Sequence, residues 1–343
     1  MRLSILIPLY NKEKHIDRCL KSLLDQDIPE SEYEIVIVDD GSKDNGPSIA
    51  ANYAEKHQNI KLIRQKNQGP SAARNNCLAA ANGNYNYFLD ADDFLAPNIL
   101  NSLLTLAEKN ELEILEFNTQ KTAENGPFPS AIPYSENDGN IQVIDGEAFV
   151  AKHGFRNEAW RYIVGKNLLD ATGIKFIEGT LYEDAIFTAS LFLKAKRMAK
   201  VDMDVHRYVV VENSIVTSKD KAHNLKFIHG MVYAIEHFQG LIKGLNSSNE
   251  DYQGVVKKLK GRQQAFTFAL IIRTLKYRLL SFKELKPILK KLNVLGAYPL
   301  DTKIGGIGNS KTRKIYNLTF VPIFNSKFLL SLGLGIMKLV PNK

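Results

Sequence analysis

The amino-acid sequence predicts an α/β protein, in which a mostly parallel sheet is covered by helices on both faces and is followed by a basic, mainly helical C-terminal region. Over the first 120 residues, short apolar runs alternate with amphipathic segments, as strands and helices do in such folds. Residues 1–220 contain 24 Lys and Arg against 32 Asp and Glu, whereas residues 221–343 contain 21 against 5. The net charge therefore changes from −8 to +16. The contents of hydrophobic (44%) and charged (24%) residues indicate a globular chain.

The strands and helices can be assigned in order. Short runs rich in β-branched or aromatic residues and closed by turn signals predict strands at residues 3–7, 34–38, 60–63, 84–89 and 112–116. In the first predicted helix, apolar residues recur at i, i+3, i+4, i+7 and i+8, namely Ile16, Cys19, Leu20, Leu23 and Leu24. Further helices are predicted at residues 46–57, 71–81 and 97–110. In a sheet of this kind, ligands bind beyond the carboxyl ends of the strands.

Three carboxylates, Asp90, Asp92 and Asp93, follow directly on the predicted strand at residues 84–89. Like charges a few ångströms apart raise one another's pKa, and a hard divalent ion is the usual relief. A metal at the carboxyl end of a strand indicates phosphate chemistry. Taken alone, the cluster is also compatible with a solvated, Asp-rich turn.

The loops after the first three predicted strands carry complementary groups. Residues 8–13 combine a proline, an aromatic ring and amide donors, on which a nucleobase could stack. Residues 39–44 offer a carboxylate for the imide N–H of a pyrimidine, and Gly41 permits a tight turn. Residues 65–75 form a small-residue loop that opens a helix carrying Arg74, which suits a diphosphate. Each loop alone is compatible with an ordinary turn or helix cap, but their joint placement favours a binding site.

Residues 7–11, 38–42, 67–75 and 90–93 resemble, in order and spacing, the successive motifs of family 2 glycosyltransferases. The resemblance covers about the first 220 residues. It implies a GT-A fold, which is Rossmann-like, and a nucleotide-diphosphate-sugar donor, with UDP favoured. It also implies a divalent ion, Mn²⁺ or Mg²⁺, held by the Asp-X-Asp motif.

Carried over by position, the resemblance assigns roles to individual residues. The donor's base and ribose would lie near Pro8, Tyr10, Asp40 and Asn67, and its diphosphate near Arg74. Asp92 is expected to be the first metal ligand, with Asp90 beside it and Asp93 extending the motif. The full set expected at the donor is Pro8, Tyr10, Asn11, Glu13, Asp39, Asp40, Asn67, Gly69, Arg74, Asp90, Ala91 and Asp92.

A second acidic pair, Glu183 and Asp184, precedes an apolar helical pattern and would alone indicate an acidic helix N-terminus. In the family that the sequence resembles, a Glu-Asp pair at this place supplies the catalytic base. The resemblance therefore implies that Asp184 is the base and that Glu183 supports it. A sugar hydroxyl must lose its proton as it attacks the anomeric carbon opposite the leaving nucleotide, which inverts that carbon.

Two further features stay open between site and structure. His206 precedes the pair Ser214-Ile215, which stands where the resembling family has a Ser-Ile pair. Trp160, the only tryptophan, could be a platform for the acceptor sugar or a core residue.

The C-terminal region is predicted to contain helices at residues 255–280 and 282–292, with Lys and Arg on one side. Residues 320–340 are mostly apolar, but their glycines, Lys327 and Lys338 argue against a membrane-spanning helix. Two interpretations stay open: a segment lying on an anionic membrane surface, or ordinary helices packed on the catalytic domain. The acidic first 220 residues argue against a nucleic-acid partner. Two cysteines in predicted helices and no signal peptide indicate a cytoplasmic protein, peripheral at the inner face of the membrane if the first interpretation holds.

We therefore expect an inverting, metal-dependent glycosyltransferase that transfers a sugar to a saccharide or lipid-linked saccharide acceptor in cell-surface polysaccharide synthesis. Residues 1–220 would form the catalytic domain, with the donor part at about 1–120 and the acceptor and base part at about 121–220, and residues 221–343 the basic helical region. One alternative is a sugar-phosphate nucleotidyltransferase, which should show a glycine-rich loop after the first strand, whereas residues 8–13 contain no glycine. The other is a non-catalytic carbohydrate-binding protein, against which the intact acidic motifs argue.

Overall fold

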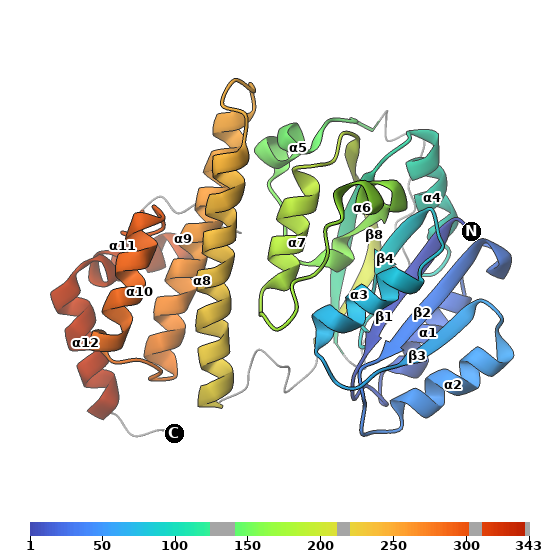
Figure 1. Ribbon diagram of the computed structural model, residues 1–343, viewed down its shortest axis with the longest axis horizontal. Helices are drawn as coiled ribbons and strands as arrows, with labels where there is room; N and C mark the ends of the chain where they lie inside the picture. Colours follow the sequence, from blue (N-terminus) through green and yellow to red (C-terminus); the bar gives the residue numbers. More distant parts are fainter. Residues whose placement is uncertain (124–140, 211–219, 302–310, 340–343) are drawn as a thin grey trace. The chain divides into compact units, whose positions relative to one another are not determined.

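The computed structural model describes residues 1–123, 141–210, 220–301 and 311–339 (Figure 1). The chain divides into two compact units. Unit 1 consists of Met1–Phe149, Phe155–Gly179 and Glu183–Glu212. Unit 2 consists of Val150–Gly154, Thr180–Tyr182 and Asn213–Lys343. Two short stretches of the N-terminal two thirds of the chain thus belong to the second unit.

Unit 1 is built on one eight-stranded sheet with the strand order β3-β2-β1-β4-β7-β6-β8-β5. Neighbouring strands run parallel from β3 to β4 and between β6 and β8, whereas β7 and β5 pair antiparallel with their neighbours. The strands are β1 (Leu3–Leu9), β2 (Tyr33–Asp39), β3 (Ile60–Arg64), β4 (Tyr85–Phe88), β5 (Phe94–Leu95), β6 (Ile114–Ala123), β7 (Tyr162–Gly165) and β8 (Met198–Val210).

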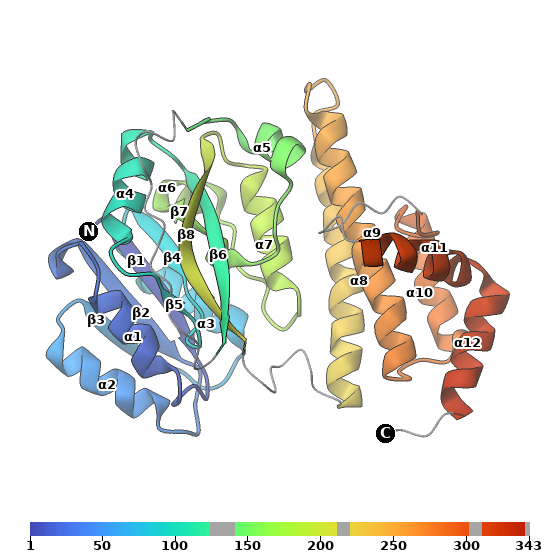
Figure 2. The same ribbon diagram turned by 180° about the vertical axis from the view of Figure 1, so that it is seen from behind.

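Helices cover both faces of this sheet (Figures 1 and 2). Alternate side chains of β1 and β2 enter a core shared with the first, second and fourth helices, and Ile5 and Ile35 are examples. Their neighbours point to the opposite face, where the third helix lies and Cys77 contacts the carbonyl of Val36. Burial on both faces explains why these strands are mostly apolar. The helices are α1 (Ile16–Leu24), α2 (Gly46–Lys56), α3 (Pro70–Ala80), α4 (Leu100–Lys109), α5 (Gly146–His153), α6 (Lys166–Thr172) and α7 (Glu183–Phe192), with 3-10 turns η1 (Glu30–Glu32) and η3 (Ala159–Arg161).

The predicted strands and helices of the first 120 residues are confirmed, with shifts at two of them. The helix predicted at residues 97–110 begins at Leu100, because Asn98 lies in the left-handed region at φ 55°, which a helix cannot include. The strand predicted at residues 112–116 begins at Ile114 and continues to Ala123. Strands β5, β7 and β8 were not predicted. The first two have only two and four residues, and β8 alternates charged and apolar side chains instead of forming an apolar run.

Unit 2 is helical: α8 (Lys221–Gly244), α9 (Tyr252–Lys276), α10 (Phe282–Val294), α11 (Lys311–Asn325) and α12 (Lys327–Leu339). The two predicted basic helices correspond to α9 and α10. A capping box between Ser281 and Glu284 opens α10. Helices α8 and α9 pack along each other, and the rings of Phe238 and Phe266 stack at 5.9 Å between them.

The apolar segment predicted at residues 320–340 forms the end of α11 and the whole of α12, and residue 340 lies outside the described residues. Val321, Phe324, Leu330 and Leu334 are buried, and α12 contacts α9, α10 and α11. In the described part of the chain, no single helix is long and apolar enough to cross a membrane. A pair of helical segments, Leu318–Asn325 and Lys327–Met337, meets those criteria together but is bent by 101°.

Gly230 of α8 provides a test of the packing in unit 2. A Cβ at this position would lie 2.6 Å from the carbonyl oxygen of Leu181, whereas a Cβ at Gly240 of the same helix would meet nothing within 4 Å. We expect Gly230→Ala to lower the free energy of unfolding by about 1–3 kcal/mol, and Gly240→Ala to raise it by about 0.5–1 kcal/mol. Thermal and urea unfolding of the two variants would measure both changes. Equal stabilities of the two variants would contradict the close approach of α8 to residues 180–182.

Candidate active site

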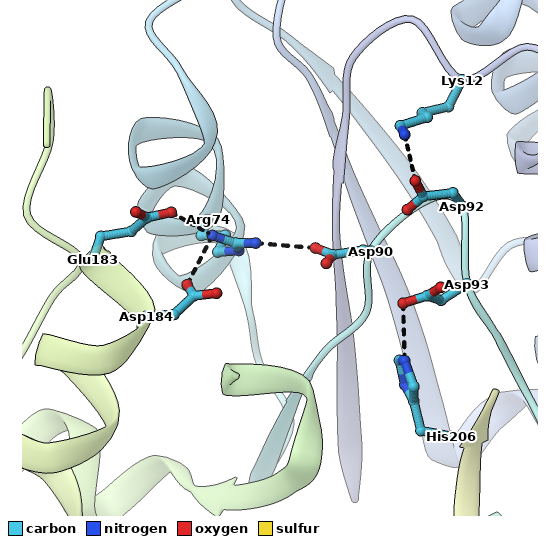
Figure 3. Close-up of polar contacts among 8 residues, drawn as sticks. All are labelled: Lys12, Arg74, Asp90, Asp92, Asp93, Glu183, Asp184 and His206. Atoms are coloured by element: carbon cyan, nitrogen blue, oxygen red, sulfur yellow. Dashed lines mark hydrogen bonds and ion pairs between the residues drawn. The ribbon is translucent and has the colours of Figure 1, made fainter. Parts of the chain in front are cut away.

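Arg74 lies at the centre of a carboxylate cluster at the carboxyl ends of the parallel strands (Figure 3). Its guanidinium is buried on α3 and donates from one terminal nitrogen to Asp90 at 3.0 Å. The other terminal nitrogen donates to Glu183 at 3.1 Å and to Asp184 at 3.0 Å. The ring of Phe176 lies 5.4 Å from the guanidinium carbon. One side chain thus joins α3, the turn after β4 and the first turn of α7.

The electrostatics keep Arg74 charged. Burial lowers the pKa of Arg74, but the charges of Asp184, Asp90 and Glu183 raise it by more, so the net shift is upward. In return, the guanidinium satisfies three carboxylates that would otherwise repel one another. Removing one partner from such a buried cluster would leave charges uncompensated.

Asp184 has an acidity suited to proton transfer. Burial raises the pKa of Asp184 to about 7, against the lowering effect of Arg74 and with further raising by Glu183 and Asp90. The residue sits in the first turn of α7, where the helix dipole favours a negative charge. Tyr182, at φ 68°, turns the chain into the helix immediately before Glu183. A carboxylate with a pKa near neutrality can accept a proton and release it again.

The three carboxylates of the turn after β4 each have their own partners. Asp90 accepts from Arg74, as described, and Asp92 accepts from the ammonium of Lys12. Asp93 is buried, and its carboxylate accepts from the main-chain N–H of Val209 at 2.8 Å and lies 2.9 Å from Nε2 of His206. The side chains of Asp90 and Asp92 remain 33% and 21% exposed, so these two face the solvent side of the turn.

His206 belongs to a buried polar chain behind this turn. Its Nδ1 lies 2.6 Å from the hydroxyl of Tyr87, and burial lowers the pKa of His206 to about 3, so the imidazole is neutral. Both ring nitrogens are thus hydrogen-bonded, Nδ1 with the hydroxyl of Tyr87 and Nε2 with Asp93. Trp160 is buried and stacks on the imidazole at 4.4 Å. For both His206 and Trp160, these contacts favour the structural interpretation.

The loops after β1 and β2 hold each other through reciprocal hydrogen bonds. Asn11 accepts from the N–H of Lys43 at 2.8 Å, and its own N–H donates to Ser42 at 3.1 Å. Glu13 accepts from the N–H of Asn45 at 3.0 Å. Tyr10 is 41% exposed on the same loop, so its ring is available to a ligand.

Asp40 organises the loop that leads into α3. Its carboxylate accepts from the main-chain N–H groups of Gln68 at 2.8 Å and Gly69 at 2.9 Å, while Asn67 donates to its carbonyl at 3.0 Å. Gly41, at φ 71°, has no room for a Cβ, which would lie 3.0 Å from the nitrogen of Asn67. Asp39 closes the adjoining turn by accepting from the N–H of Ser42 at 2.9 Å.

The structure therefore brings most of the expected residues to one edge of the sheet. They come from the loops after β1, β2, β3 and β4 and from the start of α7. Three contacts were not expected from the sequence: Lys12 with Asp92, Asp93 with His206, and Arg74 with the Glu183-Asp184 pair. The partners in each pair lie 80 or more residues apart, and no pattern in a single sequence links them. Ser214 and Ile215 lie outside the described residues.

The acidic side chains fit a divalent ion only as partial ligands. Within the described ranges, no group of three or more His, Cys, Asp or Glu side chains could hold a metal by itself. Asp90 and Asp92 offer carboxylate oxygens on the exposed side of one turn. This donor set suits a hard cation whose remaining positions are filled by phosphate oxygens and water.

Comparison with known proteins gives a family and two similar curated proteins. Residues 4–156 match the family described as Glycosyl transferase family 2. YibD of Escherichia coli (strain K12), named as an uncharacterized glycosyltransferase, is 30% identical over 220 residues, or 62% of this chain and 63% of YibD. TarP of Staphylococcus aureus (strain N315), a poly(ribitol-phosphate) β-N-acetylglucosaminyltransferase, is 27% identical over 216 residues, or 62% and 63%. The matched segment spans less than two thirds of the length of either relative.

A similar solved structure extends over nearly the whole chain. The crystal structure of residues 1–349 of S. aureus TarS in complex with UDP-GlcNAc matches with a TM-score of 0.67 at 20% sequence identity, covering 99% of this chain and 92% of that one. This likeness confirms the predicted GT-A-like fold with a helical C-terminal region.

The raised pKa of Asp184 predicts a pH-dependent stability. A carboxyl group whose pKa is higher in the folded than in the unfolded protein favours folding below its unfolded pKa, and this contribution is lost as pH rises through the folded value. Wild-type stability should therefore fall between about pH 4 and pH 7 by a component that Asp184→Asn lacks, up to about 4 kcal/mol at about 1.4 kcal/mol per pKa unit.

Urea unfolding across this pH range would measure the component. Asp170→Asn is the matched control, because Asp170 is an exposed carboxylate of α6 that pairs only with Lys166 among the described ion pairs. Parallel stability profiles for wild type and Asp184→Asn would contradict the raised pKa of Asp184.

Proposed function

We propose that this chain, whose residues 4–156 match Glycosyl transferase family 2, is an inverting, metal-dependent glycosyltransferase that transfers one sugar from a nucleotide-diphosphate-sugar to a saccharide acceptor. The proposal rests on the ion pairs of Arg74, whose guanidinium binds Asp90 and also the pair Glu183-Asp184. Such an enzyme needs a group that assists the leaving nucleotide and a base for the acceptor on opposite sides of the reacting carbon.

Asp184 would be the catalytic base. The acceptor hydroxyl oxygen forms a bond to the anomeric carbon while the bond from that carbon to the diphosphate oxygen breaks. The hydroxyl proton passes to the carboxylate of Asp184, and the electron pair of the broken bond leaves with the nucleoside diphosphate. A pKa of about 7 matches the base to neutral pH. Glu183 supports it by sharing the charge of Arg74.

The donor would lie along the loops after β1, β2 and β3. Tyr10 offers an exposed ring for the base, while Asp39, Asp40 and Asn67 shape the neighbouring turn. Gly69 is the cap residue of α3, and a helix N-terminus favours an anionic group such as the donor's diphosphate. The UDP-GlcNAc complex of TarS, which has a similar fold, supports a UDP-sugar as donor.

Asp92, assisted by Asp90, would hold Mn²⁺ or Mg²⁺ together with the diphosphate. When bound, the ion supplies positive charge that stabilises the departing nucleotide. Neighbouring residues would position the two ligands of the ion. Arg74 fixes Asp90, and the hydrogen bond from Val209 to Asp93 fixes the turn that carries Asp92.

Two substitutions separate these roles. Asp184→Asn should keep UDP and Mn²⁺ binding but lower transfer by about 10²-fold or more, because the acceptor proton has no base. Asp92→Ala should lower metal-dependent UDP affinity by at least about tenfold, because a ligand oxygen is lost. Calorimetry with UDP and Mn²⁺ and a hydrolysis and transfer screen over nucleotide-sugars would measure both.

The control is again Asp170→Asn, which should leave binding and transfer unchanged. Equal donor affinity in Asp92→Ala and wild type would remove Asp92 from the metal site. Full transfer by Asp184→Asn would remove Asp184 as the base.

We further propose a lipid-linked saccharide as acceptor, in cell-surface polysaccharide synthesis, with the enzyme peripheral at the cytoplasmic face of an anionic membrane. The support lies in unit 2, where α12 has two apolar stripes. Leu330 and Leu334 are buried, whereas Phe328, Leu332 and Ile336, one turn apart on the other side, are 74%, 49% and 51% exposed. With the net charge of +16 in residues 221–343, this stripe fits an anionic bilayer.

The stripe can be tested by replacing two of its side chains. The double variant Leu332→Asp/Ile336→Asp should bind phosphatidylglycerol-containing liposomes at least about tenfold more weakly, because two apolar anchors become charged. Both side chains are exposed, so folding should be retained, as circular dichroism would confirm.

Val294→Asp is the control, because Val294 is 82% exposed on α10 and lies outside the stripe. Liposome flotation that is unchanged in the double variant would contradict the membrane proposal.

A further inference from the structure

Lys12 is a cation that the proposed reaction has not yet used. It lies in the loop between β1 and α1 and forms an ion pair with Oδ2 of Asp92, 80 residues away in the chain. Its side chain is 33% exposed, and that of Asp92 is 21% exposed. The pair therefore lies at the rim of the carboxylate cluster, open to solvent and to a ligand (Figure 3).

The turn that carries Asp92 has supports other than Lys12. Arg18 donates to the main-chain carbonyl of Asp92 at 3.1 Å. The carboxylate of Asp93 accepts from the N–H of Val209 and contacts His206. Because these buried and main-chain contacts already fix the turn, the Lys12 ion pair is not required to build it.

We propose that Lys12 is a tethered counter-ion of Asp92 that a divalent ion displaces, and that the freed ammonium then pairs with the donor diphosphate. This inference rests on the proposed function. The ammonium of Lys12 lies against Oδ2 of Asp92, and its charge opposes a second cation at the same carboxylate, so the two cations compete for Asp92. This exchange couples the binding of the metal to the binding of the nucleotide. The metal binds Asp92 more favourably when the diphosphate is present, because the displaced ammonium of Lys12 can then pair with the diphosphate.

Arg74 and Lys12, the two basic residues in the cluster, are suited to different roles. Arg74 is buried, is shared by three carboxylates and has a rigid planar fork, so it stays in place. Lys12 is a strongly hydrated point charge on a flexible stem, in one partly exposed pair. Partly exposed pairs are worth little, so this one can be exchanged.

Metal binding without nucleotide gives the direct test. Calorimetric titration of Mn²⁺ into the full chain should give a Kd about two- to fivefold lower in Lys12→Met than in wild type, because the competing ammonium is gone. UDP should then improve Mn²⁺ affinity by a smaller factor in Lys12→Met than in wild type, because the diphosphate has lost its second cation. Lys12→Arg should restore most of the coupling.

The matched control is Lys14→Met, which removes the same charge from an exposed position two residues further along the loop. This variant should keep wild-type Mn²⁺ affinity with and without UDP. It thereby distinguishes the loss of the Lys12–Asp92 ion pair from the loss of one positive charge near the site. Mn²⁺ affinity in Lys12→Met that is unchanged or weaker without UDP would overturn the exchange. Wild type that bound neither Mn²⁺ nor UDP would contradict the proposed function itself. Wild type that bound both, with no gain of Mn²⁺ affinity in Lys12→Met, would contradict only the exchange.

Discussion

The burial of one guanidinium among three carboxylates is the constraint on which the rest of the site depends. Asp90, Glu183 and Asp184 come from segments about 90 residues apart, and their charges would separate them without Arg74. Because α3 packs on β1 and β2, the backbone that carries Arg74 is fixed. The turn after β4 and the start of α7 are positioned by their ion pairs with its guanidinium. A single side chain thereby holds the turn after β4 and the acidic start of α7 together.

The acidic turn after β4 has one buried carboxyl group and two that are partly exposed. Asp93 is buried against a neutral imidazole and a main-chain N–H, so its carboxyl group supports the fold. Asp90 and Asp92 point outward and keep exposed oxygen atoms. Three adjacent carboxylates are therefore not three equivalent ligands. The protein also balances two of them with its own cations, so the crowding of acidic residues does not by itself demand a metal ion.

Local patterns in the sequence were sufficient for the first half of the sheet and for the helices that cover it, because strands buried on both faces and helices with one apolar stripe have characteristic spacings. Apolar runs could not reveal β8, because it alternates charged and apolar side chains as a half-buried strand does, and no local pattern indicates its pairing with β6. They could not show that Arg74 meets Glu183 or that Lys12 meets Asp92, since these contacts exist only after long loops close. Resemblance supplied candidate residues for the site, but only the fold showed which of them share a counter-ion.

The division of the chain into two units has a consequence for protein engineering. The backbone passes between them five times, and Thr180–Tyr182 belongs to the helical unit although Glu183 begins a helix of the other. Tyr182 packs on Phe227 and Phe266, so the residue that precedes the acidic pair is anchored by C-terminal helices. A chimera that exchanged the helical region with that of a relative would need to carry residues 150–154 and 180–182 along. The C-terminal helices therefore form one compact unit with two short stretches of the preceding chain, and exchanging them alone would divide that unit.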